Sequence, residues 1–207
     1  MGIKAPKIEK GHKKDYLAAN QVKSILTGIN RSNLEGLRNY AIMALMITGG
    51  LRTIEVARAN VEDLAVVGGV SVLYIQGKGR TDKTEFVKIN SQVERAIREY
   101  LVARGQIKGS EPLFVSCSRR NRGQRLTTRT ISSVCKLAMI SAGLVSQRLT
   151  AHSLRHTAVT LALLAGLALA EVQHFARHSN IATTQIYAHN IDRIKSQCEN
   201  IIAQCIF

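Results

Sequence analysis

The sequence predicts a mainly α-helical fold with one small three-stranded antiparallel sheet, an α+β arrangement. Over most of the chain, apolar residues recur every three or four positions, which is the period of an amphipathic helix. Between about residues 64 and 89 the pattern changes to short β-branched runs separated by glycines, which is typical of strands joined by hairpin turns. With 207 residues, 45% of them hydrophobic, the chain is long enough to bury one core.

Several helices are predicted by the sequences at their ends. "SNLE" at Ser32–Glu35 and "SQVE" at Ser91–Glu94 fit the capping box, in which the serine caps the first turn. After Thr127 the chain is helical again, and Gly143 predicts the end of one helix. A long apolar run then predicts a buried helix over residues 152–165.

The sheet is predicted from "LAVVGGVSVLYIQGKGRTDKTEFVKIN". We expect strands near residues 64–67, 70–76 and 84–89. Two turns would join them, one at Gly68-Gly69 and one over residues 77–83, because glycine supplies the backbone angles that tight hairpins need.

The two ends of the chain differ from its middle. Residues 1–15 hold five lysines and no hydrophobic period, which indicates a basic linker or tail before a domain over residues 16–189. Residues 190–207 carry isoleucine or cysteine at helical spacing and predict an amphipathic helix. Such a helix could fold back on its own domain or dock in trans on another copy, and the pattern leaves both open.

The charge balance indicates a polyanionic partner. Lys and Arg number 29 against 14 Asp and Glu, a formal net charge of 29 − 14 = +15. Such an excess attracts nucleic acid, although an ordinary basic surface is the alternative. The four cysteines form no CxxC pair and no signal peptide opens the chain, so we expect reduced thiols and a cytoplasmic protein. The apolar run over 158–170 is shorter than the roughly 20 residues that span a bilayer, so we expect no membrane association.

Two common types of site are not predicted. A phosphate-binding P-loop fails around Lys78, because Val72 and Gly79 stand where Gly and Ser or Thr are required. The pairs His152/His156 and His174/His178 have the spacing of metal ligands, but no third carboxylate ligand lies close in sequence. We therefore expect neither a metal nor a cofactor.

Cationic residues stand at the front of the apolar helix, in "TAHSLRHTAVTLALLAG". His152 and Arg155 are three residues apart and share a face of the first turn. A helix N-terminus favours anions, so cations are disfavoured there unless an anion is to be bound. Together the two residues predict one side of a phosphate pocket.

Other candidates each have an ordinary alternative. Arg52 is followed by Glu55 one turn later, which could be a simple helix ion pair. Lys78 lies in a glycine-rich turn and could be a solvated turn lysine. His178 and Tyr187 are nine residues apart, and Asn180 is predicted to cap the helix that carries the tyrosine. A tyrosine in such a helix is more often a core residue than a nucleophile.

Taken in order, four segments resemble the tyrosine recombinase (phage integrase) family. They are "TGGLRTIEV", "GKGRTDK", "AHSLRHTAVTLALLAG" and "RHSNIATTQIYAH". The resemblance runs from about Tyr16 to Tyr187 and implies the fold of the family's catalytic domain. The chain departs from the family at Gly49, where Thr is frequent, at Ile54, where Ser is frequent, and at Arg177, where Gly is usual. The last departure affects a helix end next to His178.

The resemblance also implies how the chain is organised and what it acts on. The family places a helical core-binding domain of roughly a hundred residues before this one, so we expect a catalytic domain without it. The implied partner is double-stranded DNA with recombination sites. The protein would be monomeric when free and would assemble on DNA into a tetrameric synapse.

The resemblance assigns roles to the candidate residues. Arg52 and Arg155 would bind the scissile phosphate, and His178 would hydrogen-bond it. Tyr187 would attack it with His152 as the base, to give a 3′-phosphotyrosyl link. The remaining roles fall to Lys78, which would protonate the departing 5′-oxygen, and to Glu55, which would support Arg52. No metal or ATP is implied.

Two other functions stay open from the sequence. A type IB topoisomerase uses similar chemistry but usually has Lys where this chain has His152, so "HSLRH" favours recombination. A non-catalytic DNA-binding protein would also carry a net charge of +15. It would form no covalent adduct and would leave the ordered set of candidates unexplained.

Overall fold

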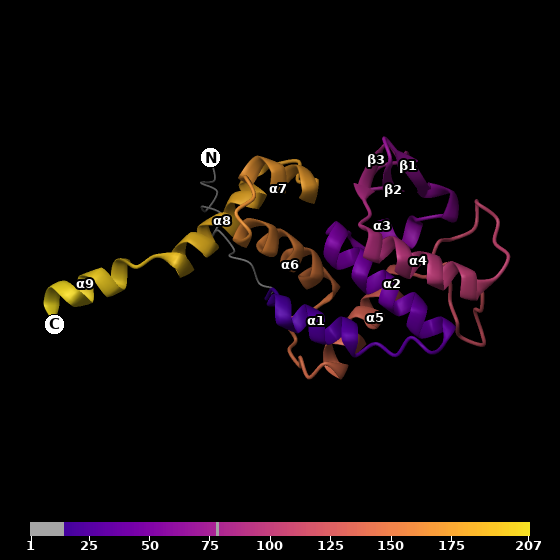
Figure 1. Ribbon diagram of the computed structural model, residues 1–207, viewed down its shortest axis with the longest axis horizontal. Helices are drawn as coiled ribbons and strands as arrows, with labels where there is room; N and C mark the ends of the chain where they lie inside the picture. Colours follow the sequence, from indigo (N-terminus) through magenta and orange to yellow (C-terminus); the bar gives the residue numbers. More distant parts are fainter. Residues whose placement is uncertain (1–14, 78) are drawn as a thin grey trace, which may run out of the picture.

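The computed structural model describes residues 15–77 and 79–207 (Figure 1). The basic segment 1–14 and the predicted hairpin lysine, Lys78, lie outside the described residues. The helices are α1 Ala19–Thr27, α2 Leu34–Gly49, α3 Thr53–Arg58, α4 Ser91–Arg104, α5 Thr128–Ser141, α6 Ala151–Leu164, α7 Leu169–Ala176, α8 Ile181–Lys195 and α9 Cys198–Ile206. The predicted mainly α fold class is confirmed.

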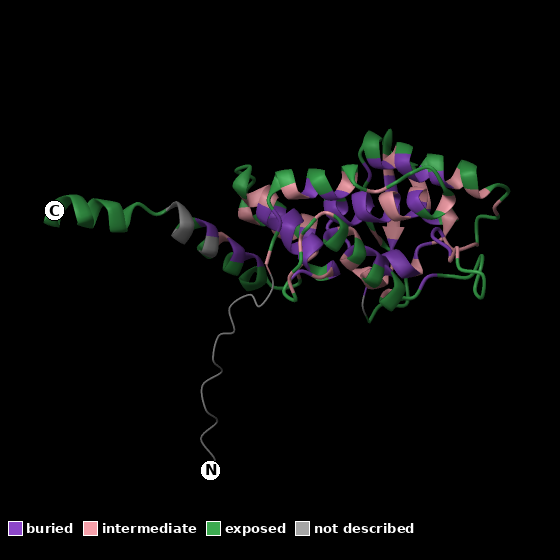
Figure 2. Cartoon of the chain, turned by 90° about the horizontal axis from the view of Figure 1, so that it is seen from below, coloured by how far each residue is buried: buried purple, intermediate pink, exposed green. Residues whose placement is uncertain are grey.

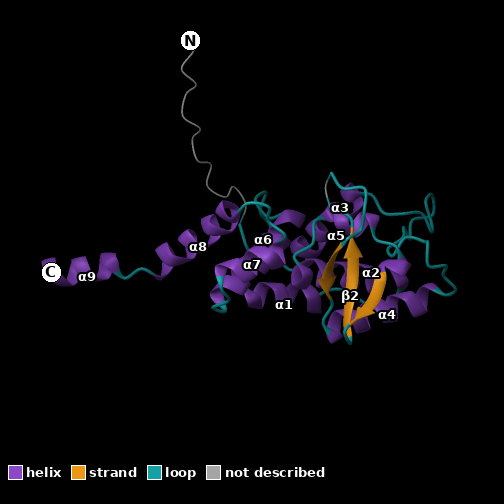
Figure 3. Cartoon of the chain, turned by 90° about the horizontal axis from the view of Figure 1, so that it is seen from above, coloured by secondary structure: helices purple, strands orange, loops and turns teal. Residues whose placement is uncertain are grey.

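One three-stranded antiparallel sheet completes the fold, as predicted. Its strands are β1 Leu64–Val67, β2 Val70–Ile75 and β3 Glu85–Lys88, in the order β1-β2-β3. The first turn is formed by Gly68 and Gly69, whose φ angles of 55° and 78° are positive and therefore suit glycine. The sheet lies at one end of the molecule, next to α2 and α4 and far from α9 (Figures 1 and 3).

The apolar core has two parts that meet at α6. The larger part surrounds α2, in which all residues from Ala41 to Ile47 are buried (Figure 2). The smaller part is formed by α6, α7 and α8 and contains Val159, Val172, Ala176 and Tyr187. Helix α6 is thus fixed from both sides, which determines where its first turn points.

The predicted helix caps are one residue out of place. Ser32 and Ser91 do not cap; Asn33 and Asn90 do, and their side-chain oxygens accept hydrogen bonds of 2.8 and 2.9 Å from the backbone N–H three residues on. Asparagine caps a helix about as well as serine, so an Asn beside a Ser leaves the start ambiguous by one residue. The predicted cap at Asn180 is confirmed by a 2.9 Å bond from the Ala182 N–H.

The segment after residue 190 is not one continuous helix. Helix α8 continues to Lys195, the chain bends at residues 196–197, and α9 runs outward from the rest of the molecule (Figure 1). No residue of α9 is buried, and Ile201 and Ile202 remain 56% and 57% exposed. The described part of this chain therefore leaves the apolar residues of α9 uncovered (Figure 2).

Candidate active site

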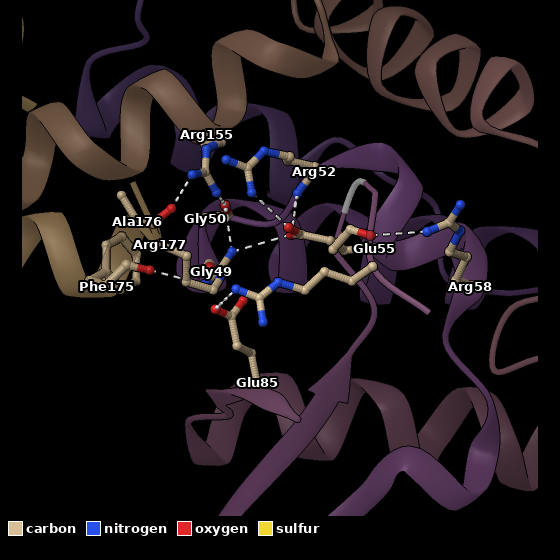
Figure 4. A network of polar contacts seen from close by, with 12 residues as sticks. Gly49, Gly50, Arg52, Glu55, Arg58, Glu85, Arg155, Phe175, Ala176 and Arg177 are labelled. Carbon is tan, nitrogen blue, oxygen red and sulfur yellow. Dashed lines mark hydrogen bonds and ion pairs between the residues drawn. The ribbon is translucent and has the colours of Figure 1, made fainter. Parts of the chain in front are cut away.

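The first turn of α6 holds Arg155 in a fixed position. Ser153 accepts a hydrogen bond from the N–H of the N-cap residue Thr150 at 3.0 Å, which sets the start of the helix. The Arg155 side chain is buried and donates to the Gly50 carbonyl at 2.6 Å and to the Ala176 carbonyl (Figure 4). Two segments distant in sequence, the turn after α2 and the end of α7, thus hold one guanidinium.

Arg52 is presented by the turn between α2 and α3. Gly50 ends α2 with a φ of 57°, and a Cβ at that position would lie 3.2 Å from the ring of Phe175. Arg52 is the N-cap residue of α3 and is partly exposed. The buried Glu55 carboxylate accepts hydrogen bonds from the Arg52 backbone N–H at 2.8 Å and from its guanidinium at 2.9 Å (Figure 4). Glu55 therefore fixes both the backbone and the side chain of Arg52.

The connection from α7 to α8 places a histidine beside the candidate nucleophile. His178 Nδ1 lies 2.9 Å from the hydroxyl of the buried Thr184, which fixes the orientation of the imidazole. The Tyr187 ring is 5% exposed, and its centroid lies 6.3 Å from that of His178 and 4.5 Å from that of His156. On the other side of His156, the Tyr16 ring stacks with a centroid distance of 6.1 Å. The Tyr187 ring therefore packs within a row of aromatic rings.

These side chains meet at one cavity of about 230 Å³. Its lining residues are Arg52, His152, Arg155, His178, Ser179, Thr183 and Tyr187. Five of the six predicted catalytic residues are therefore brought together, Glu55 lies directly behind Arg52, and Lys78 is not described. Ser179 and Thr183 were not predicted, because nothing but their closeness in sequence to His178 marked them.

A larger cavity of about 730 Å³ adjoins this one, because Arg52 and His152 line both. It runs along α5, where Arg129 and Lys136 contribute positive charge to its wall. Of the two, only the smaller cavity is also lined by Arg155, His178 and Tyr187. The larger cavity has room for a neighbouring part of an extended ligand.

Burial and repulsion between like charges shift the pKa values of the site. Burial, followed by the neighbouring Arg52 and Arg177, lowers the pKa of Arg155 from its ordinary value to about 9, although Glu55 opposes the shift. Arg155 is still cationic at neutral pH. Burial raises the pKa of Tyr187, against a lowering by Arg155, so the phenol is protonated at neutral pH. The site thus combines excess positive charge with a neutral nucleophile.

The described residues form no group of three or more His, Cys, Asp or Glu side chains that could hold a metal ion. The pair His152 and His156 is divided, since the first lines the cavity and the second packs against Tyr187. Within residues 15–77 and 79–207, no helix is both long and apolar enough to cross a bilayer.

The sequence profile of the phage integrase family matches residues 15–193. The chain belongs to this family. Among curated phage integrase relatives, tyrosine recombinase XerC of Actinobacillus pleuropneumoniae serotype 7 is 36% identical over 190 residues, which are 91% of this chain and 58% of the relative. The XerC of Pelobacter propionicus is 31% identical over 180 residues, covering 86% of this chain and 57% of the relative. The chain thus spans less than three fifths of the length of these relatives.

Solved structures confirm the fold of the phage integrase catalytic domain. The XerH site-specific recombinase, solved in a post-cleavage complex with palindromic difH substrate, matches with a TM-score of 0.73 and 25% identity over 89% of this chain and 53% of that chain. The XerA recombinase matches with a TM-score of 0.69 and 26% identity over 88% of this chain and 61% of that chain. The predicted family resemblance is therefore confirmed.

Proposed function

We propose that this chain is the catalytic domain, over residues 16–189, of a site-specific DNA recombinase that cuts and rejoins DNA strands through a 3′-phosphotyrosyl intermediate. The observation that carries the proposal is the single cavity of about 230 Å³ at which two arginines, two histidines and a tyrosine meet. Relatives named tyrosine recombinase, and the XerH complex with difH substrate, support it.

The two cavity arginines would bind the scissile phosphate. A phosphodiester anion resists nucleophilic attack until its charge is neutralised, and guanidinium groups offer paired donors that match two phosphate oxygens. Arg155 is held by two backbone carbonyls and Arg52 by Glu55, so neither has to be ordered when DNA binds. Such preorganised donors stabilise the charge that develops in the transition state.

The strand would be cut by attack of Tyr187 on phosphorus. A bond forms between the phenolic oxygen and phosphorus, the bond from phosphorus to the 5′-oxygen breaks, and His152 takes the phenolic proton. Lys78 protonates the departing oxygen, which leaves as a free 5′-hydroxyl. The contact between Thr184 and Nδ1 orients the His178 imidazole, and His178 would hydrogen-bond the phosphate. A 5′-hydroxyl from another strand reverses the step, so no external energy source is needed.

Double-stranded DNA that carries recombination sites would be the partner. The net charge of +15, together with Arg129 and Lys136 along the larger cavity, suits the phosphates that flank a cut site. The protein would be monomeric when free and would assemble on DNA into a tetrameric synapse. Helix α9 would dock in trans, because its apolar residues Ile201, Ile202 and Ile206 are uncovered in the described chain.

A trapping experiment tests the proposed cleavage. Duplexes with a randomised central sequence and a nick beside it would lose the short 5′-hydroxyl strand after cleavage, so the covalent complex would accumulate. We expect a protease-sensitive protein–DNA adduct from the wild-type chain and none from Tyr187→Phe, with similar duplex binding by both. Binding without any adduct from the wild type would refute the proposal in favour of a non-catalytic DNA-binding protein.

A further inference from the structure

Arg177 has an unusual backbone conformation for its residue type. It is the C-cap residue of α7, with a φ of 53°, and no other non-glycine residue within 15–77 and 79–207 has a positive φ. The left-handed region disfavours residues with a Cβ, which is why glycine is common at such helix ends. A long side chain that persists there is held by the surrounding structure.

The Arg177 side chain joins the two halves of the site. Its guanidinium donates to the Glu55 carboxylate at 3.2 Å and to the carbonyls of Gly50 at 3.2 Å and Phe175 at 2.9 Å (Figure 4). The side chain is only 10% exposed. Glu55 therefore binds Arg177 on one side and Arg52 on the other, and the Gly50 carbonyl accepts from both Arg177 and Arg155.

Arg177 directly precedes a residue that lines the cavity, so its contacts can affect the geometry of the site. His178, which lines the cavity, is the next residue, while Glu55 and Gly50 fix the two cavity arginines. Arg177 itself does not line the 230 Å³ cavity. Its guanidinium can therefore influence the phosphate site only through the groups that it holds.

We propose that Arg177 is a positioning residue, which sets the separation between the cavity arginines and His178 by binding Glu55 and the Gly50 carbonyl. The activity test of this inference rests on the proposed strand cleavage. A merely structural role predicts loss of stability without a selective effect on chemistry. Displacement of a reacting group by about 1 Å can slow a reaction by roughly a hundredfold, so a positioning role predicts a defect in the chemical step.

Two substitutions and a matched control separate these roles. Arg177→Asn keeps a residue that tolerates positive φ but removes the guanidinium, and Arg177→Lys keeps a cation. Arg104→Gln is the control, because Arg104 is also buried and donates to a carboxylate, Glu111, and to a carbonyl, Pro112, at the end of α4.

We expect Arg177→Asn to slow single-turnover cleavage of the nicked duplex by roughly tenfold or more, while its affinity for DNA stays within about threefold. Arg177→Lys should cleave at an intermediate rate, and Arg104→Gln at the wild-type rate. Cleavage by Arg177→Asn at the wild-type rate would overturn the proposal.

A double-mutant cycle then tests whether Arg177 acts through Glu55. If it does, adding Arg177→Asn to Glu55→Gln should slow cleavage little beyond the larger single effect, because residues in one network are not additive. Two losses that multiply would mean that Arg177 acts independently of Glu55 and would overturn this route.

Amide hydrogen exchange tests the inference independently of DNA cleavage. If the wild type formed no adduct, the proposed function would fail, but the positional link could still be measured in the same proteins. Arg177→Asn should accelerate amide exchange on both sides of the contact, over residues 50–55 and 178–184, and Arg104→Gln should not. Unchanged exchange in either segment would refute the link.

Discussion

Binding of a simple oxyanion such as sulfate should stabilise this domain by a predictable amount. Arg52, Arg155 and Arg177 interact electrostatically around one buried carboxylate, that of Glu55, so positive charge is in excess. The lowering of the Arg155 pKa to about 9, mainly by burial, corresponds to a penalty on the order of 5 kcal/mol for keeping its guanidinium charged. An anion between Arg52 and Arg155 would offset part of that penalty.

The expected size of the effect follows from mass action. At a sulfate concentration about one hundred times the dissociation constant, binding adds roughly 2.7 kcal/mol. For a domain of this size, that shift raises Tm by about 5–10 °C. Because the folded-state pKa of Arg155 is depressed to about 9, its charge is present below pH 9. The sulfate effect should therefore be complete near pH 7 and weaken as pH rises through 9.

The assay is thermal unfolding in sulfate and in chloride at equal ionic strength. Sulfate also stabilises most proteins by exclusion from their surfaces, so the specific effect is the difference between proteins that keep and that lack the cavity charge. Arg104→Gln leaves the cavity intact and should keep the full wild-type effect. Arg155→Met removes the cavity charge while keeping a long side chain, and should retain only the general effect. A sulfate-dependent rise in Tm as large in Arg155→Met as in the wild type would refute the reasoning.

Four further outcomes are expected. Burial raises the folded-state pKa of Tyr187 above its ordinary 10.0, so the stability that the neutral phenol confers is complete below pH 10 and is lost as pH rises through the folded-state value. In urea unfolding, the wild type should become less stable relative to Tyr187→Phe only above pH 10. A difference in stability that varies below pH 9 would contradict this. Gly50→Ala should cost about 2 kcal/mol more than Gly68→Ala, because both have positive φ but only the former meets the Phe175 ring; equal losses in denaturant would count against the close contact. Deleting residues 198–207 should change the Tm of the domain by no more than about 1 °C, since no residue there is buried. In gel shifts on DNA with paired sites, the truncated protein should no longer form complexes of several copies. A markedly less stable truncated monomer would instead mean that α9 packs on the core of its own chain. Lys78→Ala should cleave ordinary DNA slowly and recover on a duplex whose 5′-bridging oxygen is sulfur, and no recovery would exclude Lys78 as the acid.

Local sequence predicted the sheet and the helix starts well. The Gly68-Gly69 turn leaves few alternatives, because two successive residues with positive φ are needed there. The bend at residues 196–197 was missed, since neither Gly nor Pro marks it and the apolar period continues across it. A hydrophobic period describes which side of a helix is apolar, and it does not report where the backbone turns.

The site was predicted from ordered motifs, and so was the support of Arg52 by Glu55, whereas the contacts of Arg177 were not. The meeting of Arg52, His152, Arg155, His178 and Tyr187 at one cavity agrees with the motif order. The burial of Arg177 could not be foreseen, because its bond to Glu55 joins positions 122 residues apart. From sequence it was only a departure from the usual glycine. Tertiary packing places the Arg177 guanidinium in a buried network of hydrogen bonds.

The burial of Tyr187 affects how the protein would discriminate between DNA sequences, because it slows cleavage relative to dissociation. A phenol with an ordinary pKa of 10.0 is ionised about once in a thousand molecules at pH 7, and burial makes the ionised form rarer still. Under the proposed function, attack therefore requires His152 to take the phenolic proton once DNA is aligned in the site, and a copy that leaves an unrelated sequence before that alignment does not cut. Brief encounters end in dissociation, and only long-lived complexes reach cleavage. The buried nucleophile thus makes residence time a criterion of selection, without any additional contact to a base.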